Sequence, residues 1–265
     1  MLRSLLKISL LFILIATGLI MSAGTNTLQT EKTWRSLPLI KDGKVSQDWT
    51  LIGYGQMVID DNSLRTQHDP KGMGLLLYTK ERFGNCQIRV VYRAKDSKAN
   101  AGVFIRIDDG MLSRLNEKQT PAQRNNKGEL TPESDKGMHD DSDNLIGPWY
   151  AVHRGFEVQI CDAPDEYHRT GAIYSLAQAA PVPNLNATEW KTMLITLKGT
   201  MVLVDVDGRR ITTFDSASKD PRSKREWYEP KYDFARPASG YIGLQVHDNA
   251  GDVVYFKEVS VRALE

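Results

Sequence analysis

The feature that most constrains this chain is the strict alternation of apolar and polar residues at 155–161, which read GFEVQIC. A period of two is typical of a β-strand with one buried face. Glu157 and Gln159 share the polar face, roughly 7 Å apart at about 3.3 Å per residue. Two polar residues alone are most often an ordinary solvated face. A carboxylate beside a carboxamide also fits a binding surface, so the rest of the chain has to decide.

Strand patterns of this kind recur along most of the sequence and are separated by turn signals. Asp207-Gly208, between two apolar runs, is the strongest short hairpin signal. Other expected strands cover 86–94, 102–107, 170–174, 190–198, 240–248 and 253–264. About ten to twelve strands without a long helical period predict an all-β fold. We expect one antiparallel two-sheet sandwich or jelly roll, with no internal repeat or linker.

One segment, residues 108–150, breaks the strand rhythm. It is rich in Asp, Asn, Lys, Gln and Gly and contains three prolines. Long insertions of this kind are usually functional lids or disordered loops. This insertion joins the strand that carries Arg106 to the strand that carries Glu157. We therefore expect a lid over the polar face.

The first residues have the pattern of an exported protein. Arg3 and Lys7 precede an apolar run at 8–21, and small residues follow. This predicts a signal peptide over 1–24, and hence a secreted or periplasmic domain over 25–265. An uncleaved N-terminal membrane anchor is the alternative. Apart from that anchor, we expect no association with a membrane.

Composition narrows the partners and the chemistry. The formal net charge of +1 gives no general attraction to nucleic acid. The sequence has no GxSxG elbow, phosphate-binding loop, dinucleotide fingerprint or HExxH zinc motif. Cys86 and Cys161 are the two cysteines, and either free thiols or a disulfide is compatible with their positions. The oligomeric state has no signal in the sequence.

Candidate site residues lie in three strand patterns and beside them. Gln245 and His247 share one face of the 243–247 pattern, and Arg106 is a cation among apolar neighbours. Together with Glu157 and Gln159, they predict one polar face built from several strands. Trp149 and Tyr174 flank the Glu157 strand, and flat aromatic faces suit sugar rings. Asp162, an odd step from Glu157, is expected to bind substrate or to order a loop.

Four segments, in this order, resemble the 3-keto-disaccharide hydrolase family. They read VVYRAKDSKANAGVFIR, GFEVQICDAPDEYHRTGAIY, EWKTMLITLKG with VDVDGRRITTF, and GYIGLQVHD with VYFKEVSV. The resemblance covers about 33–264. It departs from the family in its long insertion and in Ala101, where Ser is common. It implies a concanavalin-like or LamG-like jelly roll and a carbohydrate substrate.

The resemblance also implies that the protein cleaves 3-keto-glycosides, as a hydrolase or as a lyase. A ketone at C3 acidifies the C2 proton, and the resulting enolate can expel the group at C1. Such a reaction needs a base, an electrophile at the C3 oxygen and an acid at the leaving oxygen. His247 or Glu157 could be the base, and Arg106 could stabilise the enolate.

Two further roles and two other function classes stay open. Gln159, Gln245 and Tyr174 are expected to bind hydroxyl groups. A divalent cation held by Glu157 and His247 could replace Arg106 as the electrophile. A non-catalytic carbohydrate-binding domain is the main alternative, and a structural or adhesion domain is the other, because jelly rolls host all three classes.

Overall fold

The computed structural model describes residues 33–182, 186–218 and 226–264, which belong to one compact unit. The predicted signal peptide at 1–24 lies outside the described residues. None of the helices in these ranges is both long and apolar enough to cross a bilayer.

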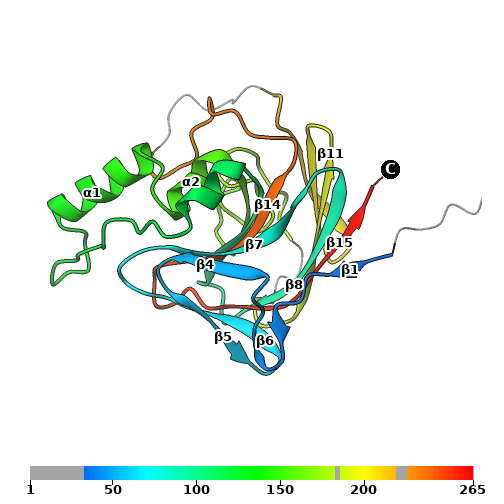
Figure 1. Ribbon diagram of the computed structural model, residues 1–265, viewed down its shortest axis with the longest axis horizontal. Helices are drawn as coiled ribbons and strands as arrows, with labels where there is room; N and C mark the ends of the chain where they lie inside the picture. The colour runs from blue at the N-terminus through cyan, green and yellow to red at the C-terminus, as the bar shows by residue number, and fades with distance from the viewer. Residues whose placement is uncertain (1–32, 183–185, 219–225, 265) are drawn as a thin grey trace, which may run out of the picture. The chain divides into compact units, whose positions relative to one another are not determined.

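The larger sheet has eight strands and is antiparallel throughout (Figure 1). Seven of its strands follow the order β13-β12-β11-β8-β15-β6-β5, and β1 pairs with β15. Its strands are β1 (Arg35–Ser36), β5 (Gln56–Asp60), β6 (Ser63–Gln67), β8 (Cys86–Ala94), β11 (Lys191–Lys198), β12 (Met201–Val206), β13 (Arg209–Asp215) and β15 (Val254–Ala263). The predicted Asp207-Gly208 hairpin is confirmed between β12 and β13, and both residues have positive φ.

The second sheet has five antiparallel strands in the order β10-β9-β14-β7-β4. Its strands are β4 (Trp49–Gly53), β7 (Gly74–Phe83), β9 (Asn100–Ile107), β10 (Phe156–Cys161) and β14 (Gly240–Val246). A small hairpin pairs β2 (Ile40–Lys41) with β3 (Lys44–Val45). Strands far apart in sequence are neighbours, as in a jelly roll.

The main core lies between the two sheets and follows the alternation of the strands. The buried apolar residues of β10 and β14 pack in it with those of β8, β11, β12 and β15. Burial of such side chains stabilises the fold by about 1.5–3 kcal/mol each. The predicted all-β, antiparallel two-sheet sandwich is confirmed.

The 108–150 insertion is ordered and covers the opposite face of the five-stranded sheet. It contains a 3-10 helix (Asp109–Arg114) and α1 (Pro132–Asp143), and it leads into α2 (Pro148–Arg154). Thr131 caps α1 by accepting a hydrogen bond from Ser134 N. Both α1 and α2 begin with a proline. α2 packs on β9 and β10, beside β14 and β7 (Figure 1). The insertion thus forms a second core on this face, as a lid would.

Two details of the chain differ from a simple strand pattern. The strand expected at 170–174 does not form, because positive φ at Gly171 and Ser175 turns the backbone. Ile173 makes only isolated bridges, with Val158 and Ala177. Cys86 and Cys161 are both free thiols.

Candidate active site

The polar face predicted from the alternation exists on β10 and β14. Phe156 and Val158 point into the main core, as do Leu244 and Val246. Glu157, Gln159, Gln245 and His247 therefore share the opposite side and line one pocket of about 270 Å³. Gly102 on β9 makes room for Glu157, because a Cβ at this position would collide with the Glu157 carboxylate.

The pocket contains six of the eight site residues predicted from the sequence. They are Trp149, Glu157, Gln159, Tyr174, Gln245 and His247. The other residues that line it are Met73, Asn100, Arg124, Leu130, Met138, Val152, Trp227, Tyr228 and Asp248. The sheet supplies most of the polar groups, and the insertion together with α2 supplies Leu130, Met138, Trp149 and Val152. The pocket is therefore amphipathic, as a sugar site usually is.

Glu157 is the buried carboxyl group of the pocket. Its residue is only 8% exposed. Burial raises its pKa to about 7, although the nearby charge of His247 opposes the shift. When the Gln159 amide is oriented to satisfy its neighbours, its nitrogen donates to Glu157 Oε1 (3.1 Å) and to Ala101 O (3.1 Å). A carboxyl group with this pKa can take up or release a proton at neutral pH.

His247 is oriented by two carboxylates that follow it in the chain. Its Nδ1 lies 2.6 Å from Asp252 Oδ2 and 3.2 Å from Asp248 Oδ1. Burial disfavours the imidazolium, but the hydrogen bond to Asp252 and the charges of Asp248, Asp252 and Glu157 outweigh it. The pKa of His247 is therefore raised. With Nδ1 engaged in this way, Nε2 is the ring nitrogen left to act on a ligand.

Gln245 provides an unpaired polar atom in the pocket. Its Nε2 donates to Met73 Sδ (3.3 Å), whereas its Oε1 is buried without a hydrogen-bond partner among the described residues. The residue is 5% exposed. A buried carbonyl without a partner costs about 1–3 kcal/mol. A ligand hydroxyl would satisfy it.

Three aromatic residues form what we call the aromatic wall: Trp149 of α2, and Trp227 and Tyr228 of the 226–236 loop. The ring centroids of Trp149 and Trp227 are 5.6 Å apart, as are those of Trp227 and Tyr228. Tyr174 lies elsewhere on the lining, and its backbone N donates to Glu157 O (2.8 Å). The sequence thus predicted only one ring of the aromatic wall, Trp149, and the loop adds the other two.

Arg106 does not share the polar face, so this part of the prediction is wrong. Tyr241 pairs with Ile107 but Gly243 pairs with Phe104, so β9 carries one extra residue here. The bulge places Arg106 at φ 52° and reverses its direction. Its Nη2 donates to Gly199 O (2.6 Å), and its guanidinium interacts with Cys86 of the other sheet. Arg106 is not among the residues that line this pocket.

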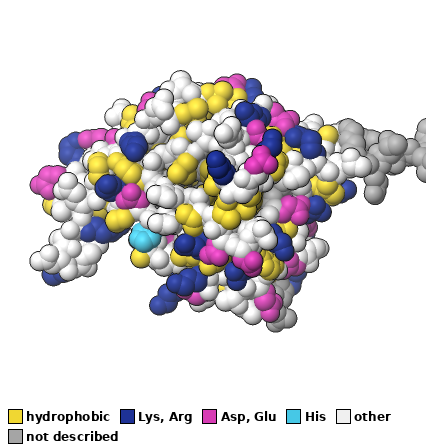
Figure 2. All heavy atoms as spheres, turned by 60° about the horizontal axis from the view of Figure 1, so that its bottom comes forward, with side chains coloured by type: hydrophobic (Ala, Val, Ile, Leu, Met, Phe, Trp, Pro, Cys, Tyr) yellow, Lys and Arg dark blue, Asp and Glu magenta, His cyan; other side chains and the backbone are white. Residues whose placement is uncertain are grey.

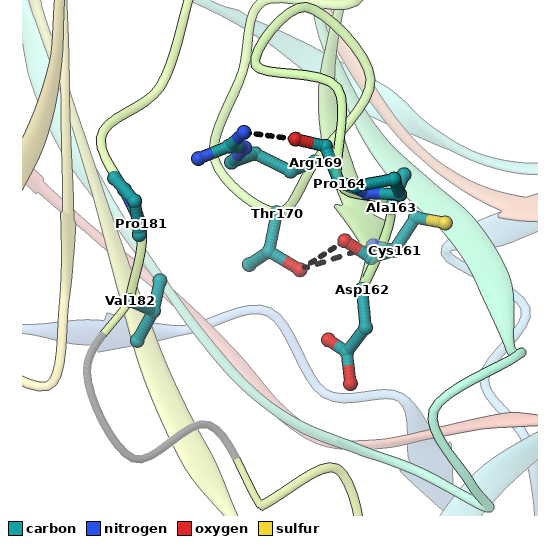
Figure 3. A pocket seen from close by; sticks show the side chains of 8 residues that line it. All are labelled: Cys161, Asp162, Ala163, Pro164, Arg169, Thr170, Pro181 and Val182. Carbon is teal, nitrogen blue, oxygen red and sulfur yellow. Dashed lines mark hydrogen bonds between the residues drawn. The ribbon is translucent and has the colours of Figure 1, made fainter.

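Asp162 also lies apart from the pocket. It lines a separate cavity with Pro164, Arg169 and Thr170 beyond the end of β10 (Figure 3). There Thr170 Oγ1 accepts from Cys161 N and donates to Cys161 O (both 3.0 Å), while Arg169 donates to Pro164 O. Arg169 Nε is nevertheless buried without a hydrogen-bond partner among the described residues. Because side chains alternate along a strand, Asp162 faces a different side from Glu157, and the substrate-binding role expected for it finds no support in this position.

The pocket offers two side chains, Glu157 and His247, that were expected to bind a metal ion. No group of three or more His, Cys, Asp or Glu side chains that could hold a metal ion occurs in 33–182, 186–218 or 226–264. The expected pair of Glu157 and His247 thus lacks a third ligand of these types within those ranges.

Several residues of the site were not predicted from the sequence. Asp252 is one of them, although it stands only five residues after His247. Trp227 and Tyr228 were also not predicted, and the available signal was an aromatic pair in an otherwise charged loop.

Acidic and basic side chains are interspersed on the face shown in Figure 2, in agreement with the low net charge.

Comparison with known families gives one match. The family described as the 3-keto-alpha-glucoside-1,2-lyase-like domain matches residues 33–262, which is nearly the whole described chain. A comparison with curated proteins found no significant match.

Solved structures with the same fold are distant in sequence. A candidate glycosyl hydrolase from Parabacteroides distasonis ATCC 8503 superposes with a TM-score of 0.55 at 20% identity, covering 88% of this chain and 100% of its own. A second candidate glycosyl hydrolase from that organism gives 0.51 at 16%, covering 82% and 89%. A carbohydrate-binding module, CBM66 from Bacillus subtilis, gives 0.47 at 12%, covering 82% and 96%. At these identities the likeness to the two candidate glycosyl hydrolases shows the fold alone.

Proposed function

The chain belongs to the 3-keto-alpha-glucoside-1,2-lyase-like domain family, and on that premise we propose that it cleaves the glycosidic bond of 3-keto-glycosides. One observation carries the proposal. A buried carboxyl group whose pKa is about 7, Glu157, lines the same pocket as His247, which two carboxylates hold. General base catalysis is most effective when the pKa of the base lies near the working pH.

The proposed reaction begins at C2 of the sugar. The Glu157 carboxylate takes the C2 proton, and the electron pair of the C2–H bond delocalises onto the C3 oxygen as an enolate. The enolate then re-forms the C3 carbonyl, a double bond forms between C1 and C2, and the C1–O bond breaks. The leaving oxygen accepts a proton from His247 Nε2.

The remaining polar groups of the pocket position the sugar. Gln245, whose Oε1 is buried and unpaired among the described residues, accepts a hydrogen bond from a sugar hydroxyl. The Gln159 amide, shared with Glu157, holds the carboxylate at its place. Addition of water to the unsaturated product completes a net hydrolysis, and its release without water makes the reaction that of a lyase.

An aryl 3-keto-glucoside tests the proposal directly. The wild-type protein is expected to release the phenol from p-nitrophenyl 3-keto-glucoside, and in D₂O to introduce deuterium at C2 of returned substrate. The parent glucoside, which has no ketone, is the matched control and should give no phenol. Saturable binding without product would instead identify a non-catalytic carbohydrate-binding domain. Product analysis by NMR separates the unsaturated sugar from 3-keto-glucose.

We also propose that the protein acts outside the cytoplasm. The support is the basic start, apolar run and small residues of 1–24. Expression of the full chain in a bacterium, followed by fractionation and N-terminal sequencing, is expected to give an extracytoplasmic protein that begins near residue 25. A cytoplasmic, unprocessed chain would overturn this.

A further inference from the structure

The loop that carries Trp227 and Tyr228 is attached to the insertion by buried hydrogen bonds. Ser142 of α1 donates through Oγ to Trp227 O (3.2 Å), and its Oγ lies 2.7 Å from His153 Nε2 of α2. The backbone N of Lys231 donates to His153 Nδ1 (3.2 Å). Both Ser142 and His153 have no exposed surface. We call this set of bonds the Ser142–His153 bridge.

The direction of every bond in the bridge follows from the donors available. His153 Nδ1 accepts from an N–H, so it carries no proton. The one proton of the Ser142 hydroxyl points to Trp227 O, so Ser142 Oγ accepts from His153 Nε2–H. Burial, with the charges of Lys231 and Arg236, lowers the pKa of His153 to about 3, so this neutral tautomer persists at working pH. Because all donors and acceptors are matched, the pair holds the loop and is not a nucleophile and its base.

Ring contacts carry the position of the loop into the pocket. Trp149 stacks on His153 with centroids 6.3 Å apart, and it contacts Trp227 on another side. His153 also meets Phe234 of the same loop, at 6.1 Å. The bridge therefore fixes both parts of the aromatic wall, the helix and the loop, relative to one another.

The lining of the pocket is divided into two chemically different parts. Glu157, Gln159, Gln245 and His247 come from the sheet side, whereas the insertion, α2 and the 226–236 loop contribute the aromatic wall together with Leu130, Met138, Val152 and one cation, Arg124. A keto-sugar ring carries polar groups at each ring carbon and matches the first part. A second ring with a flat apolar face matches the second part.

We propose that the aromatic wall is a separate subsite for the leaving group, that it takes a leaving group with a flat apolar face, and that the Ser142–His153 bridge holds it in place. Such a leaving group is an aryl ring or a second pyranose. The inference rests on the proposed function for the identity of the sugar, and it deepens that function by assigning the other half of the substrate. Ser142 and His153 are positioning residues in this arrangement.

The first test needs no ligand. Hydrogen–deuterium exchange of the full-length protein is expected to show faster exchange across 226–236 in Ser142→Ala than in wild type. Ser134→Ala is the matched control, because Ser134 is also a buried serine of α1, but its hydroxyl bonds Gln123 N and Pro121 O within the insertion. It should leave the exchange of 226–236 unchanged. Equal exchange in Ser142→Ala and wild type would remove the bridge from the proposal.

The second test measures binding in a Glu157→Gln background, where turnover does not interfere. Dissociation constants are measured for methyl, phenyl and glucosyl 3-keto-glucosides. Trp227→Ala is expected to weaken the phenyl or glucosyl ligand, or both, about three- to tenfold and to leave the methyl ligand unchanged. The affected ligand tells an aryl from a pyranose leaving group. Ser142→Ala should weaken the same ligands and add little in the Trp227→Ala background.

Three results would contradict the inference. They are equal weakening of the methyl ligand, no weakening of either ring ligand, and full additivity of the two substitutions. The proposed function fails differently, through a wild-type protein that binds these ligands without product. The binding constants would then still decide whether the wall is a subsite.

Discussion

Nδ1 of His247 lies 2.6 Å from Oδ2 of Asp252, a residue that is itself buried at the end of the turn that leads into β15. Thr66 Oγ1 donates to the Asp252 backbone oxygen (3.0 Å) and accepts from Val254 N (2.9 Å), so β6 fixes the turn on which Asp252 stands. The orientation of the imidazole therefore depends on both sheets of the fold. This relationship engages Nδ1 and raises the pKa of His247, so the imidazole is not a free surface group.

Asp252→Asn tests this dependence. Losing the carboxylate charge removes a large part of what raises the pKa of His247, so burial should then lower that pKa. We expect kcat/KM to fall roughly tenfold to hundredfold and the alkaline limb of its pH profile to move to lower pH. Asp248→Asn is the control, because Asp248 lies farther from Nδ1, at 3.2 Å, and also pairs with Arg124. It should have the smaller effect. An alkaline limb that stays in place would show that His247 is not the acid.

The wild-type pH profile has an expected shape of its own. Glu157 must be deprotonated to act as the base, and its pKa is about 7, so kcat/KM should rise with pH through about 7. The pKa of His247 is raised above its ordinary value, and its proton is needed at the leaving oxygen, so activity should fall again on the alkaline side. The two groups interact, so the limbs belong to the pair. A profile already flat from pH 5 to 7 would contradict this assignment of the base.

The free energy of unfolding should also depend on pH through the ionisation of Glu157. Its pKa is raised from 4.5 to about 7 on folding, so the charged carboxyl group costs stability. That cost is absent below pH 4.5, grows as the pH rises, and reaches about 3 kcal/mol above pH 7. Glu157→Gln should therefore raise the free energy of unfolding by about 1–3 kcal/mol at pH 8 and leave it nearly unchanged at pH 4. Urea denaturation at both pH values measures it. A variant less stable than wild type at pH 8 would contradict the burial cost.

The alternation in the sequence was sufficient to predict the sheets and most of the polar face, because side-chain direction in a regular strand has a period of two. That rule places Glu157 with Gln159, and Gln245 with His247. It fails where the backbone is irregular. The bulge at Arg106 depends on pairing with β14, and pairing between distant strands leaves no local signal.

The parts of the site that come from loops were harder to predict for a related reason. Trp227 and Tyr228 stand on a loop that is held by hydrogen bonds from distant segments, among them those of Ser142 and His153. Asp252 reaches His247 only because Thr66 of another strand holds its turn. Contacts of this kind depend on tertiary packing, which neither residue spacing nor composition records.

Arg106→Met tests whether Arg106, at the bulge of β9, lies outside the active site. The guanidinium is buried away from the pocket, burial lowers its pKa, and its Nε has no hydrogen-bond partner among the described residues. Replacing such a group by an apolar side chain of similar length removes the desolvation cost, but it also removes the bond to Gly199 O. We expect the free energy of unfolding to change by less than about 2 kcal/mol, and kcat/KM per folded molecule to stay at the wild-type value. Thermal unfolding and turnover of an aryl 3-keto-glucoside measure both, with Glu157→Gln as the inactive reference. A folded Arg106→Met protein without turnover would show that Arg106 takes part in catalysis.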